Sequence, residues 1–451
     1  MYKKKFEFGK DFVWGVATAA FQIEGGKDAD GKGESIWDVC AHTPGKIHDG
    51  SNADVACDSY HRVEEDIALL DDLGVNAYRF SLSWPRILPN GIGKVNEKGI
   101  KYYNRLINGL LSKNITPYVT LYHWDLPQAL QEKGGLLNKE FPQWFLEYTK
   151  VVAEHFGDRV KYFFTFNEPQ SFLPTVCPPC IPYTKREQLI RIHHMLLAHG
   201  LSAKELHKIQ GAKVGYVSCG LVPLPQSDSQ EDYEAAKKLF FSINPDAPED
   251  GTSIYAEPIF SGKYPDEYYR IFKDDLPEIG EKDMEIISEP LDFWAQNTYE
   301  GFYIKSKYNG KGELEAEKIA REWGAPITVL GWDIAPKALY YVTKYVYEQY
   351  GKPIYLAENG TALYDYVFSD GMVHDPARIE FIHNYLNYLE QAKKEGVEIL
   401  GYFYWALLDN FEWFQGLSPR FGLVHVDYQT LKRTKKDSFY VYRDIIYNSK
   451  K

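Results

Sequence analysis

The chain has 451 residues and a mass of 52.0 kDa; 44% of the residues are hydrophobic and 25% are charged. These values are typical of a soluble globular protein with a sizeable core. Lys and Arg total 51 against 63 Asp and Glu, so the formal net charge is −12, and no acidic or basic tail concentrates it. This balance argues against a nucleic-acid or anionic-membrane partner.

The N-terminal segment resembles a secretory signal only superficially. Three lysines at 3–5 precede an apolar run at 12–20, but Glu7, Lys10 and Asp11 interrupt the order that a signal needs. We therefore expect a first β-strand there. No stretch approaches the roughly 18 apolar residues of a membrane-spanning helix. The five cysteines are an odd number in a long chain, which favours a reducing cytoplasm over a disulfide framework.

Apolar β-rich runs alternate with longer amphipathic segments along the chain. One helical segment is predicted at Tyr60–Leu73, with Gly74 ending it. Most of the apolar runs are continuous, as in parallel strands that are covered on both faces. The eight predicted strands are Phe12–Ala20, Ala77–Trp84, Thr116–Trp124, Lys161–Asn167, Lys213–Cys219, Asp292–Tyr299, Pro353–Glu358 and Leu400–Leu407.

No linker, low-complexity segment or short-period repeat divides the chain, so residues 1–451 are predicted to form one domain. Eight βα units in one domain indicate an α/β fold of the (β/α)8 TIM-barrel type, with long βα loops forming a mouth at one end. A doubly wound open sheet is the alternative.

Barrel enzymes build their sites at the carboxyl ends of the strands. In this sequence those ends carry acidic, amide, imidazole and indole groups. In a barrel, all of these groups would lie at the same mouth. Two further candidates lie in the loop after the last strand. The candidates are Gln22, Arg79, His123, Trp124, Asn167, Glu168, Tyr299, Glu358, Trp405, Glu412 and Trp413.

Glu168 and Glu358 can divide the roles of acid and nucleophile across such a mouth, provided that their surroundings separate the two pKa values. The indoles and hydrogen-bonding groups around them suit a sugar, which has an apolar face of C–H bonds and a rim of hydroxyls. The alternative is that both glutamates are solvated or salt-bridged carboxylates without a catalytic role.

Three other motifs do not support a metal or cofactor. Residues 26–33 nearly match a phosphate-binding P-loop, but Gly33 replaces its Ser or Thr. Cys177 and Cys180 have CxxC spacing without a second pair, which favours a structural or incidental role. His193, His194 and His199 lack the helical acid of a zinc motif and are expected to be core or surface residues. No metal or cofactor is predicted.

Nine motifs, in this order and spacing, resemble glycoside hydrolase family 1, the β-glucosidase family, essentially from end to end. They are Phe12–Gly15, Gln22–Gly25, Tyr78–Ser81, Ser83–Arg86, Tyr122–Pro127, Thr165–Pro169, Glu358–Gly360, Asn410–Trp413 and Arg420–Gly422.

The resemblance implies a retaining β-glycosidase that removes terminal, non-reducing β-D-glucosyl residues from a small-molecule β-glycoside or oligosaccharide. Glu168 would be the general acid/base and Glu358 the nucleophile, with Arg79 and Tyr299 supporting the nucleophile and Trp332 lining the aglycone side. Activity on galactosides or fucosides, and the oligomeric state, stay open. The implied glycone subsite consists of Gln22, His123, Trp124, Asn167, Trp405, Glu412 and Trp413.

The sequence departs from the family pattern in three places. The loop at Gln170–Pro182 differs from the usual continuation and contains prolines and apolar residues, so we expect it to govern the aglycone and to favour aryl glucosides. Ala357 replaces a usual Thr, and Thr298 replaces a usual Tyr. Both replacements are expected to shift local hydrogen bonds without removing a catalytic group.

Two rival functions remain. A 6-phospho-β-glycosidase of the same family carries Ser in place of Glu412, with a Lys and a Tyr where this chain has Pro419 and Phe421, so a phosphate dianion would be repelled here. The second rival is a non-catalytic sugar-binding relative, which would typically lack one of the two glutamates.

Overall fold

The computed structural model describes residues 4–173 and 182–449 of the chain. Eight parallel strands close into a barrel in the order β1-β11-β10-β7-β5-β4-β3-β2. The barrel prediction is confirmed, and the open-sheet alternative is wrong. All eight predicted strands are present, as β1 (Val13–Thr18), β2 (Ala77–Ser81), β3 (Thr116–Tyr122), β4 (Tyr162–Asn167), β5 (Lys213–Ser218), β7 (Phe293–Asn297), β10 (Ile354–Asn359) and β11 (Ile399–Trp405).

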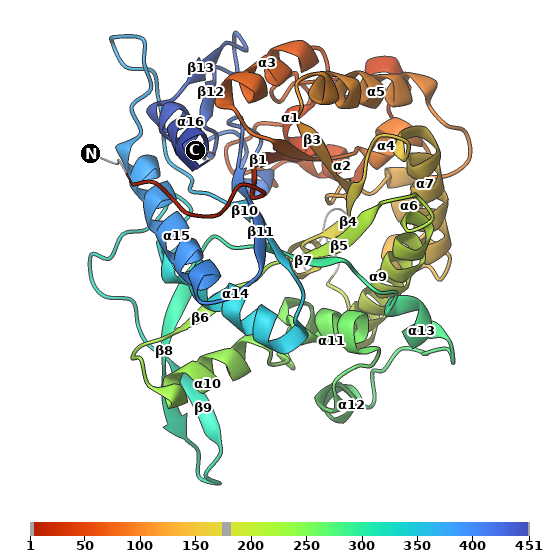
Figure 1. Ribbon diagram of the computed structural model, residues 1–451. Helices are drawn as coiled ribbons and strands as arrows, with labels where there is room; N and C mark the ends of the chain where they lie inside the picture. Colours follow the sequence, from red (N-terminus) through yellow and green to blue (C-terminus); the bar gives the residue numbers. More distant parts are fainter. Residues whose placement is uncertain (1–3, 174–181, 450–451) are drawn as a thin grey trace.

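Helices surround the barrel (Figure 1). Among the described residues, none of them is long and apolar enough to cross a membrane. The long ones are α3 (Val63–Leu73), α5 (Glu97–Ser112), α7 (Phe141–Phe156), α9 (Lys185–Leu206), α10 (Gln230–Phe240), α14 (Lys337–Tyr350), α15 (Pro376–Lys394) and α16 (Asp437–Ser449).

Helix α3 begins three residues later than predicted. The backbone N–H groups of His61 and Arg62 bond to the Asp58 carbonyl, so this segment forms turns before the helix starts at Val63. The predicted end is confirmed, because Gly74 adopts φ 75° and stops the helix in a left-handed conformation.

Aromatic side chains fill the barrel interior below the mouth. Tyr118 stacks on Tyr162 with ring centroids 4.3 Å apart, and Phe403 packs edge-on against Tyr118. Glycine on β1 makes room for this packing, since a Cβ at Gly15 would lie 2.3 Å from the Phe403 ring. These rings form a packed floor below the mouth of the barrel.

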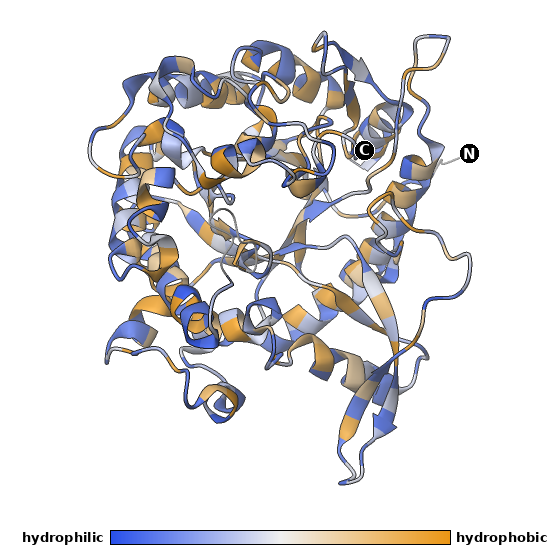
Figure 2. Ribbon diagram, turned by 180° about the vertical axis from the view of Figure 1, so that it is seen from behind, coloured by the Kyte–Doolittle hydropathy of each residue, from blue (hydrophilic) through white to orange (hydrophobic). Residues whose placement is uncertain are grey.

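A separate three-stranded sheet was missed by sequence analysis. It consists of β6 (Val222–Pro225), β8 (Gly301–Tyr308) and β9 (Leu314–Lys318) in the order β6-β8-β9. The β8–β9 hairpin projects from the barrel, and Figure 2 shows both hydrophilic and hydrophobic residues along it. Because only two of the eight residues of β8 are buried, it lacks the continuous apolar run of a barrel strand. The turn at 309–312 was the available signal.

A second small sheet, also missed, pairs β12 (Val424–Val426) with β13 (Arg433–Lys435). Both strands have three residues, which is too short for a hydrophobic period to be recognised. This sheet follows the loop after β11, so it anchors the segment that carries Glu412 and Trp413.

Candidate active site

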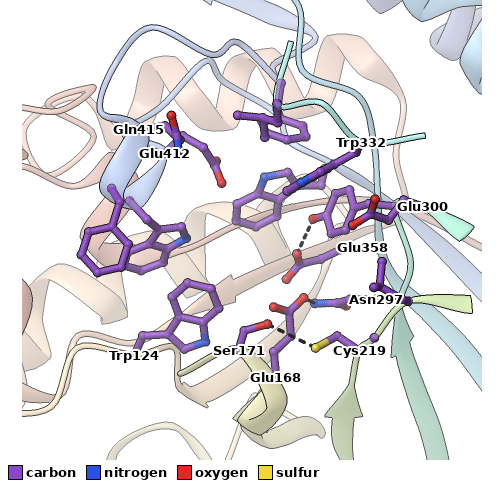
Figure 3. A pocket seen from close by; sticks show the side chains of 18 of the residues that line it. Trp124, Glu168, Ser171, Cys219, Asn297, Glu300, Trp332, Glu358, Glu412 and Gln415 are labelled. Carbon is purple, nitrogen blue, oxygen red and sulfur yellow. Dashed lines mark hydrogen bonds between the residues drawn. The ribbon is translucent and has the colours of Figure 1, made fainter. Parts of the chain in front are cut away.

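A cavity of about 460 Å³ opens at the carboxyl ends of the barrel strands (Figure 3). Both predicted catalytic glutamates point into it. The sequence-predicted residues that line it are His123, Trp124, Glu168, Tyr299, Trp332, Glu358, Trp405, Glu412 and Trp413.

The other three predicted residues lie behind the cavity wall and contact residues that form it. Arg79 donates to Glu358, Asn167 packs between Arg79 and His123, and Gln22 donates to Glu412. Gln22 Oε1 and His123 Nδ1 are buried without a hydrogen-bond partner in the described part of the chain. Atoms of this kind can be satisfied by the hydroxyls of a bound ligand.

Glu358 is held at both carboxylate oxygens. It lies near the end of β10, where Arg79 Nη1 donates to Oε1 at 2.6 Å and the Tyr299 hydroxyl donates to Oε2 at 2.6 Å. Burial raises the pKa of Glu358 above its ordinary value, and the Arg79 charge and the Tyr299 hydrogen bond oppose this rise without cancelling it. The two donors fix the direction of the carboxylate, as a nucleophile requires.

Glu168 has a different environment. It follows β4 directly, and Asn297 Nδ2 donates to its Oε1 at 2.7 Å. Burial, reinforced by the negative charge of Glu358, raises the pKa of Glu168 to about 7. Glu168 therefore holds its proton to much higher pH than an ordinary glutamate, as a general acid must.

Glu412 is the third carboxyl group of the cavity. Burial and the charges of Glu358 and Glu168 raise its pKa to about 8. Gln22 Nε2 donates to Glu412 Oε2 at 3.4 Å. Next to it, Trp413 packs against Trp124 with ring centroids 4.4 Å apart. This side of the cavity combines a hydrogen-bonding carboxyl with an aromatic surface, the pairing that a sugar ring needs.

Backbone conformation directs three of these side chains. Trp124, Glu168 and Trp413 have φ values of 77°, 50° and 47°, which are uncommon for residues other than glycine. Such conformations persist only where the surrounding structure holds them, and they concentrate at functional sites.

A buried ionic network supports the loop that carries Glu412. Asp409 accepts from Lys436 Nζ at 2.7 Å through one oxygen and from Arg420 Nη1 at 2.7 Å through the other. Lys436 and Asp409 are fully buried. Asp409 also accepts from the Gly422 backbone N–H at 2.9 Å, so the network ties both ends of the loop together.

Several lining residues were not predicted. Asn297 ends β7 as Asn167 ends β4, so the strand-end argument could have found it. Phe421 packs beside Tyr299 and Trp332, at centroid distances of 5.9 and 6.1 Å. Ser171 belongs to the segment Gln170–Pro182 that was expected to govern the aglycone. The remaining ones are Cys219, Gly220, Leu221, Glu300, Leu330, Phe414 and Gln415.

The two departures next to the glutamates leave the contacts intact. The Ala357 carbonyl accepts from Arg79 Nη1 at 3.2 Å, an interaction of the backbone that any residue could make. The Thr298 backbone N–H donates to the Glu358 carbonyl at 3.0 Å. Most of the third departure, the loop at Gln170–Pro182, lies outside the described residues, as do Cys177 and Cys180.

The histidines of α9 have structural partners, as expected. His193 bonds to Tyr264 and Asp283, His194 bonds to the Leu136 carbonyl, and His199 bonds to Thr165. Residues 26–33 contain only a short 3-10 turn and no phosphate-binding helix start. Within residues 4–173 and 182–449, no group of three or more His, Cys, Asp or Glu side chains is placed to hold a metal ion.

A closed barrel whose mouth holds two carboxyl groups in unlike environments, beside aromatic walls, has the architecture of a carboxyl-pair glycoside hydrolase. The chain belongs to glycosyl hydrolase family 1, whose sequence model matches residues 4–451.

Relatives in sequence and structure agree with this assignment. A 1,4-beta-D-glucan glucohydrolase of Thermotoga neapolitana is 43% identical, over 99% of each chain. Beta-glucosidase A of Thermotoga maritima is also 43% identical, over 100% of this chain and 99% of the relative. A solved family 1 β-glucosidase from Thermotoga maritima superposes with a TM-score of 0.89 at 42% identity, covering 99% of both chains. Another structure of that enzyme, in complex with deoxynojirimycin, has a TM-score of 0.88 at 41% identity, covering 98% of this chain and 99% of the other.

Proposed function

We propose that the chain is a retaining β-glucosidase in which Glu168 is the general acid/base and Glu358 the nucleophile. The observation that carries the proposal is the unequal surroundings of the two carboxyl groups. Glu358 contacts a cation and a hydroxyl donor, whereas burial raises the pKa of Glu168 to about 7. The names of the Thermotoga relatives support glucoside hydrolysis.

In the first step, a Glu358 carboxylate oxygen attacks the anomeric carbon of a bound β-glucoside. The bond to the leaving oxygen breaks, and Glu168 transfers its proton to that oxygen, so the aglycone leaves as a neutral alcohol. Arg79 and Tyr299 hold the attacking carboxylate at the angle that the reaction needs. The product of this step is a glycosyl ester of Glu358.

In the second step, Glu168 is ionised and removes a proton from a water molecule that attacks the same carbon. The ester bond breaks, and Glu358 leaves as a carboxylate. Two inversions give net retention of the β configuration. Retaining enzymes place their carboxyl groups about 5–5.5 Å apart, and inverting ones about 6.5–9.5 Å apart.

We propose an unphosphorylated hexose as the glycone. The cavity lining contains four carboxyl groups and, among the described residues, no Lys or Arg. The described lining therefore offers no cation that would compensate the charge of a phosphate dianion. This charge distribution disfavours the 6-phospho-β-glycosidase, and the presence of both glutamates in one cavity disfavours a non-catalytic role.

Two measurements test the proposal. Hydrolysis of a panel of nitrophenyl glycosides should show turnover of the β-glucoside, with galactoside and fucoside rates defining the breadth of the glycone site. NMR of the first-formed sugar should show the β anomer. An α first product would refute retention, and inactivity on every aryl β-glycoside would revive the sugar-binding alternative.

We further propose that the protein acts in the cytoplasm as one folding domain. Cys57 and Cys219 are buried free thiols, which suits a reducing compartment. Fractionation of the native host tests the compartment, and a single cooperative calorimetric transition tests the domain assignment. Activity confined to the culture medium, or two separate transitions, would contradict these two statements.

A further inference from the structure

A short chain of polar side chains lies beside the carboxyl group of Glu168. Ser171 lies three residues after Glu168, on α8 (Pro169–Phe172), and its backbone N–H donates to the Glu168 carbonyl at 2.9 Å. This turn brings the Ser171 side chain back toward the Glu168 side chain, and both line the catalytic cavity (Figure 3). The Ser171 hydroxyl hydrogen-bonds to the Glu168 carboxyl group.

The second member of this chain is Cys219, which follows β5 and is buried. Its Sγ lies 3.3 Å from Ser171 Oγ and 3.8 Å from Gln170 Oε1. Burial and the negative charge of Glu168 raise the pKa of the Cys219 thiol, so the thiol stays protonated and can donate. Gln170 Nε2 in turn donates to Ser218 Oγ at 2.9 Å, which fixes the far end of the chain.

The Ser171 hydroxyl has one proton and two neighbours that can accept it. An ionised Glu168 accepts the Ser171 proton, and Ser171 Oγ then accepts from the Cys219 thiol. When Glu168 is protonated, the Ser171 hydroxyl can turn its proton to Cys219 Sγ, and the thiol can turn its own to Gln170 Oε1. The chain therefore stays hydrogen-bonded in both protonation states of Glu168, but the bond from Ser171 is charge-assisted in the ionised state alone.

We propose that Ser171 is a positioning residue: its hydroxyl donates to the Glu168 carboxylate when Glu168 acts as base, and turns toward Cys219 Sγ when Glu168 carries its proton. The proposal rests on the proposed β-glucosidase function, in which Glu168 gives a proton in the first step and accepts one in the second. Because the bond favours the ionised form, Ser171 sets how far up in pH the acid form survives and how far down the base form is available.

Other groups around Glu168 set the background for this effect. Burial and the negative charge of Glu358, on β10, raise the pKa of Glu168, whereas the Asn297 amide on β7 and the positive charge of Arg79 on β2 oppose the rise. The charged or titratable side chains that interact with Glu168 are Glu358, Arg79, Glu412, Tyr299 and Cys219. Substitutions at position 171 leave all of them in place, so a changed pH dependence reports on the hydroxyl.

The test compares Ser171→Thr with Ser171→Val, two side chains of nearly equal size of which only threonine has a hydroxyl. The basic limb of kcat/KM for an alkyl β-D-glucoside is measured for both variants and for wild type. Loss of the donor destabilises ionised Glu168, so Ser171→Val should move this limb about one pH unit higher, whereas Ser171→Thr should stay within about 0.3 of wild type. Ser171→Ala should move the limb in the same direction and guards against a poor fit of valine.

A second readout follows the base step. A dinitrophenyl leaving group needs no proton, so with this glucoside the hydrolysis of the glycosyl ester limits kcat and requires ionised Glu168. The acidic limb of kcat should therefore also move to higher pH in Ser171→Val and Ser171→Ala. A merely structural role of Ser171 would lower the rates at every pH and leave both limbs in place.

Three results would overturn the proposal. They are limbs of Ser171→Val and Ser171→Ala that stay in place or move to lower pH, an equal shift in Ser171→Thr, and a loss of rate without a shift. A wild-type protein that hydrolyses no β-glucoside, or a basic limb that persists in Glu168→Gln, would instead refute the proposed function or its assignment of the acid. The two failures are therefore distinguishable.

Discussion

The surroundings of Glu358 and Glu168 differ more than their positions do. Both side chains come from the carboxyl ends of parallel barrel strands and point into one cavity (Figure 3). Arg79 and Tyr299 each donate to Glu358, whereas Asn297 donates to Glu168. Chemically identical side chains therefore acquire different functions from the cations, donors and charges around them.

Removing the nucleophile tests this comparison most severely. Glu358→Ala should reduce kcat/KM by on the order of 10⁴-fold or more on every β-glucoside, because the variant lacks the carboxylate that forms the glycosyl ester. Added azide should restore turnover with an α-glycosyl azide as product, identified by NMR. Substantial activity of this variant without azide, on any aryl glucoside, would show that Glu358 is not the nucleophile.

Removing the acid should have a selective effect. Glu168→Gln should lose about 10²- to 10⁴-fold for alkyl glucosides, which need a proton on the leaving oxygen, and far less for dinitrophenyl glucosides. Azide should now yield the β-glycosyl azide. The same azide anomer from the Glu358 and Glu168 variants would show that the pair is misassigned.

The pH dependence of kcat/KM tests the protonation of Glu168 directly. Glu168 must be protonated in the first step, and its pKa is raised to about 7, so wild-type kcat/KM for an alkyl glucoside should fall as pH rises through about 7. The Glu168→Gln variant should lack this fall. A basic limb of equal slope in both proteins would assign the titration to another group.

The third carboxyl group, Glu412, extends the comparison to substrate binding. If it accepts hydrogen bonds from glucose hydroxyls, Glu412→Ser should weaken glucoside hydrolysis by about 1.5–3 kcal/mol, or roughly 10- to 150-fold in kcat/KM. Nitrophenyl glucoside and its 6-phosphate should be measured side by side. Full activity of the variant on the glucoside would remove Glu412 from the glycone site.

The smallest effect concerns stability. The pKa of Glu412 is about 8 in the folded chain against an ordinary value of 4.5, so its contribution to stability is fully present below about pH 4.5 and is lost as pH rises through about 8. Glu412→Gln removes this loss. The melting temperature of the variant relative to wild type should rise by roughly 1–3 °C between pH 5 and pH 9, by calorimetry. A constant difference would contradict the assignment.

The sequence alone determined the barrel and the positions of the catalytic candidates. Parallel strands buried on both faces appear as continuous apolar runs, so all eight were recognisable, and residues that end such strands must meet at one mouth. Exposed β8 has no such run and was missed. Helix α3 began late because the backbone turn around Asp58 competes with the helical pattern.

Only the tertiary structure decided how the site residues act on one another. The contact of Arg79 with Glu358 joins residues 279 positions apart, and the pKa of Glu168 depends on how completely the fold removes it from water. Hydrophobic period is a property of neighbouring residues, whereas desolvation, Coulomb interaction and cavity shape depend on distances through space between segments far apart in the chain.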